Sequence, residues 1–122
     1  MAARYELKPT KNGEIMFNLL AGNNEVILTS QMYKEKSGAM HGIESVQKNS
    51  PIDGQFERKT AHNDKFYFDL HAANKQIIGK SEMYKTKASM EKGIASVKKN
   101  GPVKVIKDLT LVEKPKAKAA KA

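Results

Sequence analysis

Residues 17–51 read FNLLAGNNEVILTSQMYKEKSGAMHGIESVQKNSP, and residues 68–102 read FDLHAANKQIIGKSEMYKTKASMEKGIASVKKNGP. The two stretches align without a gap at an offset of 51 residues, and 17 of the 35 aligned positions are identical. Internal identity at a fixed period is the sequence signature of a duplicated structural unit. Upstream the match is weaker, with Tyr5 over Phe56. The chain is therefore predicted to contain two copies of one small unit.

Each copy is predicted to form three strands. The middle strand alternates, and its apolar face is the same in both copies: Ile15, Phe17 and Leu19, and then Phe66, Phe68 and Leu70. A short strand from Tyr5 to Lys8 precedes it in the first copy. Tight turns at Asn23-Asn24 and Asn74-Lys75 lead to the third strand, because asparagine tolerates a left-handed backbone.

A helix is predicted to follow the strands in each copy. Its apolar positions recur at spacings of four and three: Ala39, Ile43 and Val46, and then Met90, Ile94 and Val97. Serines at positions 30 and 81 are predicted to be N-caps. Asparagines at 49 and 100 are predicted to end the helices in a left-handed conformation, and prolines at 51 and 102 prevent continuation. The glycines at 42 and 93 are predicted to let the helix approach the sheet closely.

The predicted fold class is therefore α+β, built from two tandem β-β-β-α repeats with antiparallel sheets and two main helices. Residues 103–107 are a candidate for a closing strand. The domain boundaries are predicted at residues 1–51 for the first repeat and 52–112 for the second, which together form one compact unit. Residues 113–122 contain mainly Lys, Ala and Pro, and they are predicted to be a disordered tail.

A repeated phrase gives the sequence a family resemblance. The pattern S-x-M-Y-K-x-K followed by G-I-x-S-V-x-K-N occurs at 30–36 with 42–49, and again at 81–87 with 93–100. It resembles the YegP-like family of small bacterial proteins, and the resemblance covers roughly residues 4–103. The resemblance implies an α+β fold whose repeats pack around a pseudo-twofold axis. It brings no function, and no catalytic or ligand-binding residue is transferred from it.

Composition excludes several classes of protein. The absence of cysteine rules out disulfides, thiolate metal sites and cysteine nucleophiles. No apolar run approaches the roughly 18 residues of a membrane span, and the first residues do not read as a signal peptide. A cytoplasmic location is expected.

No enzymatic activity is expected. A different residue stands opposite each histidine in the other copy: Lys92 opposite His41, Lys11 opposite His62 and Leu20 opposite His71. No HExxH, P-loop, dinucleotide or GxSxG motif occurs, and no carboxylate cluster has metal-ligand spacing. The histidines are therefore predicted to be solvated, and no catalytic, cofactor-binding or metal-binding residue is predicted.

Positive charge is concentrated in the second half of the chain. The net charge is +1 for residues 1–51, +5 for residues 52–112 and +3 for residues 113–122, which gives +9 overall. Such a field favours weak attraction to polyanions. The leading hypothesis is a non-enzymatic binding module that contacts nucleic acid or an acidic protein through Lys85, Lys87, Lys92, Lys98, Lys99, Lys114, Lys116, Lys118 and Lys121. Spacings of six and seven are predicted to place Lys92 near Lys98 and Lys99 on one side of the second helix.

Two alternatives stay open. One is a protein-interaction or assembly module that pairs through a sheet edge, with the oligomeric state unknown. The other is a small-anion-binding protein with two equivalent sites at helix N-termini, formed by Ser30, Tyr33 and Lys36 and by Ser81, Tyr84 and Lys87. Purely structural roles are favoured for these repeated polar residues.

Tyr67 and His71 share a strand face that can stack bases, although Asp69 between them repels phosphate.

Overall fold

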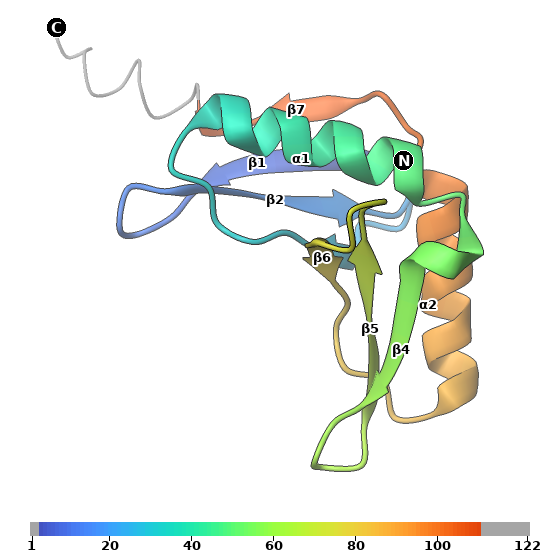
Figure 1. Ribbon diagram of the computed structural model, residues 1–122. Coiled ribbons are helices and arrows are strands. Elements are labelled where there is room, and N and C mark those ends of the chain that lie inside the picture. The colour runs from blue at the N-terminus through green and yellow to red at the C-terminus, as the bar shows by residue number, and fades with distance from the viewer. Residues whose placement is uncertain (1–2, 111–122) are drawn as a thin grey trace, which may run out of the picture.

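A computed structural model describes residues 3–110. The order of its strands and helices along the chain is that of two β-β-β-α units (Figure 1). The first unit contains β1 (Arg4–Pro9), β2 (Ile15–Leu20), β3 (Val26–Thr29) and α1 (Lys36–Asn49). After a short 3-10 helix (Asp53–Gln55) the second unit contains β4 (Phe56–Thr60), β5 (Phe66–His71), β6 (Ile77–Lys80) and α2 (Lys87–Asn100), followed by β7 (Ile106–Asp108). The predicted α+β class is confirmed.

Within residues 3–110 the strands form one seven-stranded sheet in the order β4-β5-β6-β3-β2-β1-β7. All neighbours are antiparallel except β1 and β7, which run parallel. The closing strand exists, but it begins three residues later than the start of the predicted segment at 103–107. The reason is a turn after α2, in which the Val103 amide donates to the Asn100 carbonyl and the Gln47 side chain donates to the Val103 carbonyl.

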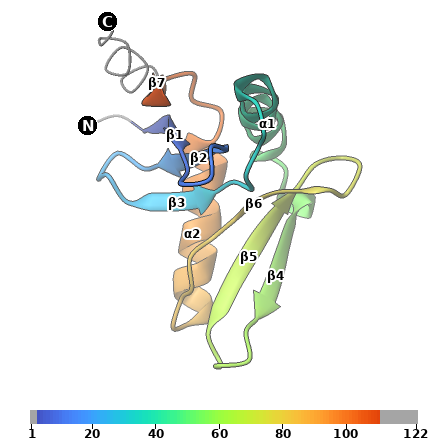
Figure 2. The same ribbon diagram turned by 90° about the vertical axis from the view of Figure 1, so that its left-hand side faces the viewer.

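The two units meet at a pseudo-twofold axis. β3 and β6 are hydrogen-bonded at Thr29 and Lys80, which are equivalent positions in the two repeats. Figure 1 shows the result: α1 runs along β1 and β2, whereas α2 runs along β4 and β5 in a clearly different direction. Figure 2 shows the same arrangement from the side, with α1 seen almost end-on.

The tight turns also repeat. Asn24 and Lys75 have φ values of 70° and 71°, and Gly13 and Asp64 have 85° and 65°. Each pair occupies equivalent positions in the two units. The predicted left-handed turn residues at Asn23-Asn24 and Asn74-Lys75 are therefore confirmed, including a lysine in a conformation that asparagine and glycine adopt more readily.

The core is built from two equivalent aromatic groups. Tyr5 meets Phe17 edge-on at 5.9 Å between ring centroids, and Tyr33 stacks on Phe17 at 6.2 Å. The second unit repeats this with Phe56, Phe68 and Tyr84, at 5.6 Å and 6.4 Å. Phe17 and Phe68 are both fully buried. The shared apolar face predicted for the middle strands thus places these two residues in equivalent environments.

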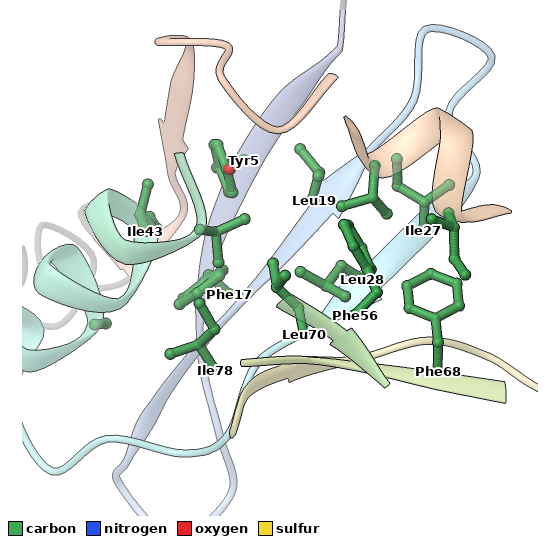
Figure 3. Packing of buried hydrophobic residues seen from close by; sticks show 14 of the residues in the cluster. Tyr5, Phe17, Leu19, Ile27, Leu28, Ile43, Phe56, Phe68, Leu70 and Ile78 are labelled. Atoms are coloured by element: carbon green, nitrogen blue, oxygen red, sulfur yellow. The ribbon is translucent and has the colours of Figure 1, made fainter. Parts of the chain in front are cut away.

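The helices join the two units into one core. α1 contacts β2 of its own unit and also β5 and β6 of the other, and α2 contacts β5 and also β3. Figure 3 draws Ile78 near Phe17 and Ile27 near Phe68, and α1 contacts β6 while α2 contacts β3. Each third strand therefore packs against the helix of the other unit. Neither unit buries its apolar face by itself.

One glycine in each helix permits its close packing against the sheet. A Cβ atom on Gly42 would lie 2.4 Å from the Tyr33 hydroxyl oxygen and 2.9 Å from a ring carbon of Phe17. A Cβ atom on Gly93 would lie 2.3 Å from the Tyr84 hydroxyl oxygen. The close approach predicted from these repeated glycines is confirmed. The side chain nearest to each glycine is the tyrosine of the same unit.

The predicted helix ends need two corrections. Serines 30 and 81 are not N-caps, because α1 begins after Glu35 and α2 begins after Thr86, whose hydroxyl accepts from the Ser89 amide. The intervening residues return to the sheet, where Tyr33 and Tyr84 form backbone bridges to the start of the middle strands.

The helix-ending asparagines do not adopt the left-handed conformation. Asn49 and Asn100 close the last helical turn in another way, since each side-chain amide donates to a serine carbonyl four residues earlier, at 2.8 Å and 2.9 Å. The residues that follow, Ser50 and Gly101, also keep right-handed helical angles.

Candidate functional site

Five of the lysines predicted to contact a polyanion lie on α2 or just before it, and the structure divides them into two groups. Lys92 and Lys99 are exposed, and their spacing of seven residues places them on one helical stripe. That stripe lies opposite the buried face formed by Met90, Gly93, Ile94 and Val97. Lys85 is exposed just before the helix. We call Lys85, Lys92 and Lys99 the outer lysines, and none of them has an ion-pair partner within residues 3–110.

The other two lysines lie at the side of α2 that faces β4. Lys98 donates to the Asp53 carboxylate at 2.5 Å, and Lys87 lies 5.9 Å from the ring centroid of Phe66. The prediction that grouped Lys98 with Lys92 and Lys99 is wrong. Its physical reason is the position of Asp53, which the chain brings against α2 from the short 3-10 helix.

An ion-pair network neutralises the acidic groups beside α2. Arg58 donates to Glu91 at 2.6 Å and to Asp53 at 3.1 Å. The hydrogen bond from Arg58 lowers the pKa of Glu91, and hydrogen bonds from Lys98 and then Arg58 lower the pKa of Asp53. Both carboxylates are therefore ionised and paired at neutral pH, which leaves the outer lysines as uncompensated charge.

The equivalent surface of the first unit has no such excess. Residues 34–48 hold three lysines and two glutamates, whereas residues 85–99 hold five lysines and one glutamate. In addition, Lys36 at the start of α1 forms an ion pair with Asp108 of β7. The charge asymmetry seen in the sequence thus becomes a difference between two helices of the same shape.

The serines of the predicted small-anion sites do not lie at the helix N-termini. Ser30 accepts a hydrogen bond from the Phe17 amide at 2.9 Å and donates to the Gln31 carbonyl at 2.7 Å, and Ser81 repeats this with Phe68 and Glu82. These hydroxyls bind the sheet and lie away from the helix N-termini. The tyrosine hydroxyls face Gly42 and Gly93 in the helix interiors. The anion sites stay predictions, without a convergent set of donors to support them.

A second polar cluster lies on the β4–β5 hairpin. Glu57 on β4 and Asp69 on β5 are paired in register, and His71 follows two residues later on β5. The His71 Nε2 atom lies 3.1 Å from Glu57 Oε1, and the Lys59 ammonium lies 2.8 Å from Asp69 Oδ2. The hydrogen bond to Asp69 raises the pKa of Lys59. We call Glu57, Lys59, Asp69 and His71 the hairpin cluster.

This cluster corrects the prediction for one histidine. The imidazole of His71 is 22% exposed and its Nε2 atom is buried, so His71 is not a solvated histidine. The predicted base-stacking face is also altered, because Tyr67 has the Lys80 ammonium 5.5 Å from its ring centroid and Asp69 is fully buried.

Sequence reasoning missed the hairpin cluster for an identifiable reason. Repetition in both copies indicates residues that the unit needs, and the first unit has Leu20 in place of His71 and Asn18 in place of Asp69. The spacing of two between Asp69 and His71 does place both on one strand face, but this face is interpreted from the sequence as a base-stacking surface. The partner Glu57 depends on the strand register, which the sequence did not define.

Both repeats of the chain match one known protein family. The family described as "Domain of unknown function (DUF1508)" matches residues 10–57 and again residues 61–108. The chain belongs to this family. The tandem match agrees with the duplication, and together with the YegP relative described below it confirms the YegP-like resemblance. Neither the family description nor the repeated motif assigns an activity.

Relatives match along most of their length. The chain is 56% identical to the UPF0339 protein of Shewanella oneidensis over 110 residues, which is 90% of this chain and 100% of that protein. It is 53% identical to the UPF0339 protein YegP of Escherichia coli K12 over 110 residues, again 90% and 100% of the two chains.

Solved structures have the same fold. The solution NMR structure of the Shewanella oneidensis protein has a TM-score of 0.84 at 55% identity, and it covers 89% of this chain and 92% of that one. The solution NMR structure of the Escherichia coli protein of unknown function has a TM-score of 0.85 at 52% identity, with 89% and 94% covered.

Two earlier expectations are limited by the extent of the structure. The predicted tail at 113–122, with Lys114, Lys116, Lys118 and Lys121, lies outside the described residues. Among residues 3–110, no helix combines the length and the apolar character needed to cross a membrane.

Proposed function

We propose that this chain is a non-enzymatic cytoplasmic binding protein that holds nucleic acid weakly, in a salt-sensitive way, through the outer face of α2. The observation that carries the proposal is the set of outer lysines, Lys85, Lys92 and Lys99, which are exposed beside acidic groups already paired with other cations. Exposed cations held on a helix and on the residues just before it attract a polyanion without reading its sequence.

The expected strength follows from the number of charges. Each lysine that neutralises a phosphate releases counterions, so log K falls with log salt by about 0.9 per contact on duplex DNA. Three outer lysines correspond to a slope of about −2.7. Binding of this kind is weak at physiological salt and does not discriminate between sequences.

The edges of the sheet favour this proposal over assembly through strand pairing. β4 is one edge strand, and its central residues Glu57, Arg58 and Lys59 are charged. β7 is the other edge strand and contains three residues, one of which, Asp108, pairs with Lys36. Charged and short edge strands are features that prevent pairing with other chains.

The first test removes two outer lysines and compares them with two other exposed lysines. We expect the double variant Lys92→Gln, Lys99→Gln to make the salt slope less steep by about 1.8 in a filter-binding titration with duplex DNA. The control is Lys11→Gln, Lys65→Gln, which changes net charge equally at two hairpin turns. It is expected to keep the slope nearly unchanged. Equal effects of both double variants, or no binding of the parent chain at low salt, would contradict the proposal.

The second test concerns the tail lysines. A chain that ends at Glu113 lacks Lys114, Lys116, Lys118 and Lys121. If these four also contact phosphates, truncation makes the slope less steep by about 3.6, and the α2 contribution persists. Gel-shift titrations at two salt concentrations measure this. The same affinity for both chains would restrict the binding surface to α2.

A further inference from the structure

The hairpin cluster contains three side chains of the types that bind metal ions. Asp69 and His71 alternate onto one face of β5, and Glu57 comes from the neighbouring strand β4. One ligand atom from each of the three lies within 4.8 Å of the other two. Imidazole and carboxylate are the ligands of zinc-class sites with three protein ligands.

Asp69 has a buried oxygen that the fold itself does not use. Its side chain is 1% exposed, and the Oδ1 atom has no hydrogen-bond partner among residues 3–110. A buried carboxylate oxygen without a partner is costly, and such groups are normally hydrogen-bonded or bound to a cation. The equivalent residue in the first unit is Asn18, whose neutral amide donates to Thr29. The unit therefore folds without a charge at this position.

The Lys59 ammonium lies between the carboxylates of Asp69 and Glu57, at the position where a metal ion would bind them. Its ammonium is 2.8 Å from Asp69 Oδ2 and 3.9 Å from Glu57 Oε1, so it lies within reach of both carboxylates. The lysine side chain is 33% exposed, and the Glu57 side chain is 52% exposed. Both can therefore rotate toward solvent while Asp69 stays fixed. One monovalent cation balances two carboxylates only in part, and it does not bind His71.

We propose that Glu57, Asp69 and His71 bind a divalent metal ion of the zinc class, which displaces the Lys59 ammonium. Tetrahedral bonds of about 2.1 Å require ligand atoms about 3.4 Å apart. The His71–Glu57 separation of 3.1 Å is already close to this value. The ligand atoms of Asp69 and His71 lie within 4.8 Å of each other, so the metal ion requires a small movement of one of these two side chains. Rotation of the exposed Glu57 side chain adjusts only its own distances to them.

A hollow of about 360 Å³ adjoins the cluster and is lined by Glu57 and His71 together with Gly54, Gln55, Ala72 and Lys75. The Asp69 oxygens and the His71 Nε2 atom are buried, so the ion enters as the partly exposed Lys59 and Glu57 side chains rotate outward. A water molecule is expected to complete the coordination from the side of the hollow. The first unit lacks the site, because Leu20 replaces His71. The stoichiometry is therefore one ion per chain.

The experiment titrates the full chain with Zn²⁺ alone. Calorimetry gives the stoichiometry and affinity, and ¹⁵N NMR of the imidazoles identifies the ligand. We expect one ion to bind, with a large shift of the His71 Nε2 resonance. His41 and His62 serve as controls within the same spectra, and their resonances are expected to stay in place. Shifts of equal size at all three histidines, or the absence of binding, would overturn the proposal.

Two variants separate the ligands from the competing cation. The double variant Asp69→Asn, His71→Leu introduces the residues that the first unit has at these positions, so it is compatible with the fold. It is expected to weaken Zn²⁺ binding by more than roughly tenfold, because even groups that only orient a ligand contribute 10–100-fold. Lys59→Gln is expected to tighten binding, since it removes the displaced charge. Unchanged affinity in the double variant would show that zinc binds elsewhere.

Discussion

Gly42→Ala is expected to lower the free energy of unfolding by about 1–3 kcal/mol, the range typical of overpacked cores. The sign is the informative part, because glycine in the middle of a helix is normally less favourable than alanine by about 1 kcal/mol. Here the added methyl group would lie 2.4 Å from the Tyr33 hydroxyl oxygen and 2.9 Å from Phe17. Gly93→Ala is expected to behave in the same way, against Tyr84.

The tyrosine cannot move aside easily. Tyr33 is stacked on Phe17 at an interplanar angle of 11°, and its backbone amide and carbonyl are both bonded to Ile15. Phe17 is fully buried. The added atom therefore has to be accommodated by a shift of the helix away from the sheet, which weakens contacts along the whole of α1.

Urea denaturation of the single and double variants measures this effect. Tyr33→Phe removes the nearest oxygen, and we expect it to restore part of the stability lost in Gly42→Ala, while the contact with Phe17 keeps the rescue incomplete. Gly38→Ala on the same helix is the control, because its nearest neighbour would lie at 3.3 Å. A stabilising Gly42→Ala would show that the helix and the sheet are not in contact as described.

The glycines show which features of the fold the sequence can predict. Gly42 and Gly93 are identical in the two copies, and so are Tyr33 and Tyr84. Retention in both copies therefore identified the positions that matter for packing. The identity of the contact was not predictable, because it depends on the segment that returns Tyr33 to the sheet before α1 begins.

The same segment explains the error at the helix starts. A repeated serine ahead of an amphipathic helix is typical of an N-cap. Ser30 is repeated for another reason. It directly follows β3, and its hydroxyl accepts a hydrogen bond from the Phe17 amide of the neighbouring strand β2. Local sequence does not distinguish these two roles, because both satisfy a free backbone donor with a serine oxygen.

The candidate sites were less predictable than the fold, because they combine residues far apart in the sequence. Lys98 is paired with Asp53, 45 residues earlier, and this contact removes it from the free cations of α2. The hairpin cluster was overlooked because Asp69 and His71 occur in one copy only. Comparison between copies identifies what the unit needs in order to fold, and it discounts what one unit acquired separately.

The pseudo-twofold axis leads to the second large effect. Leu28 and Gly79 are equivalent positions, and they face each other where β3 meets β6. A Cβ atom on Gly79 would lie 2.7 Å from Leu28 Cγ. Ser50 and Gly101 are another equivalent pair, and a Cβ atom on Gly101 would lie 2.0 Å from the Ser50 hydroxyl oxygen. Each place has room for one side chain, which one unit supplies and the other omits.

We therefore expect Gly79→Leu alone to destabilise the protein by about 3 kcal/mol or more, at the upper end of overpacking. Leu28→Gly alone is expected to cost about 3–5 kcal/mol, because it leaves a cavity in the centre of the core and a flexible residue in a strand.

The exchanged variant, with Leu28→Gly and Gly79→Leu together, is expected to recover most of the stability lost in either single variant. The surrounding residues make this possible, since Phe17 and Leu19 of one unit have identical counterparts in Phe68 and Leu70 of the other. Leucine at position 79 therefore enters the same space from the opposite side of the axis. Urea denaturation of the four proteins gives the coupling free energy, which we expect to be at least about 4 kcal/mol, above the range of about 0.5–3 kcal/mol typical of residues in contact. Additive losses would mean that the two positions do not share one space, and the axis would then lie elsewhere.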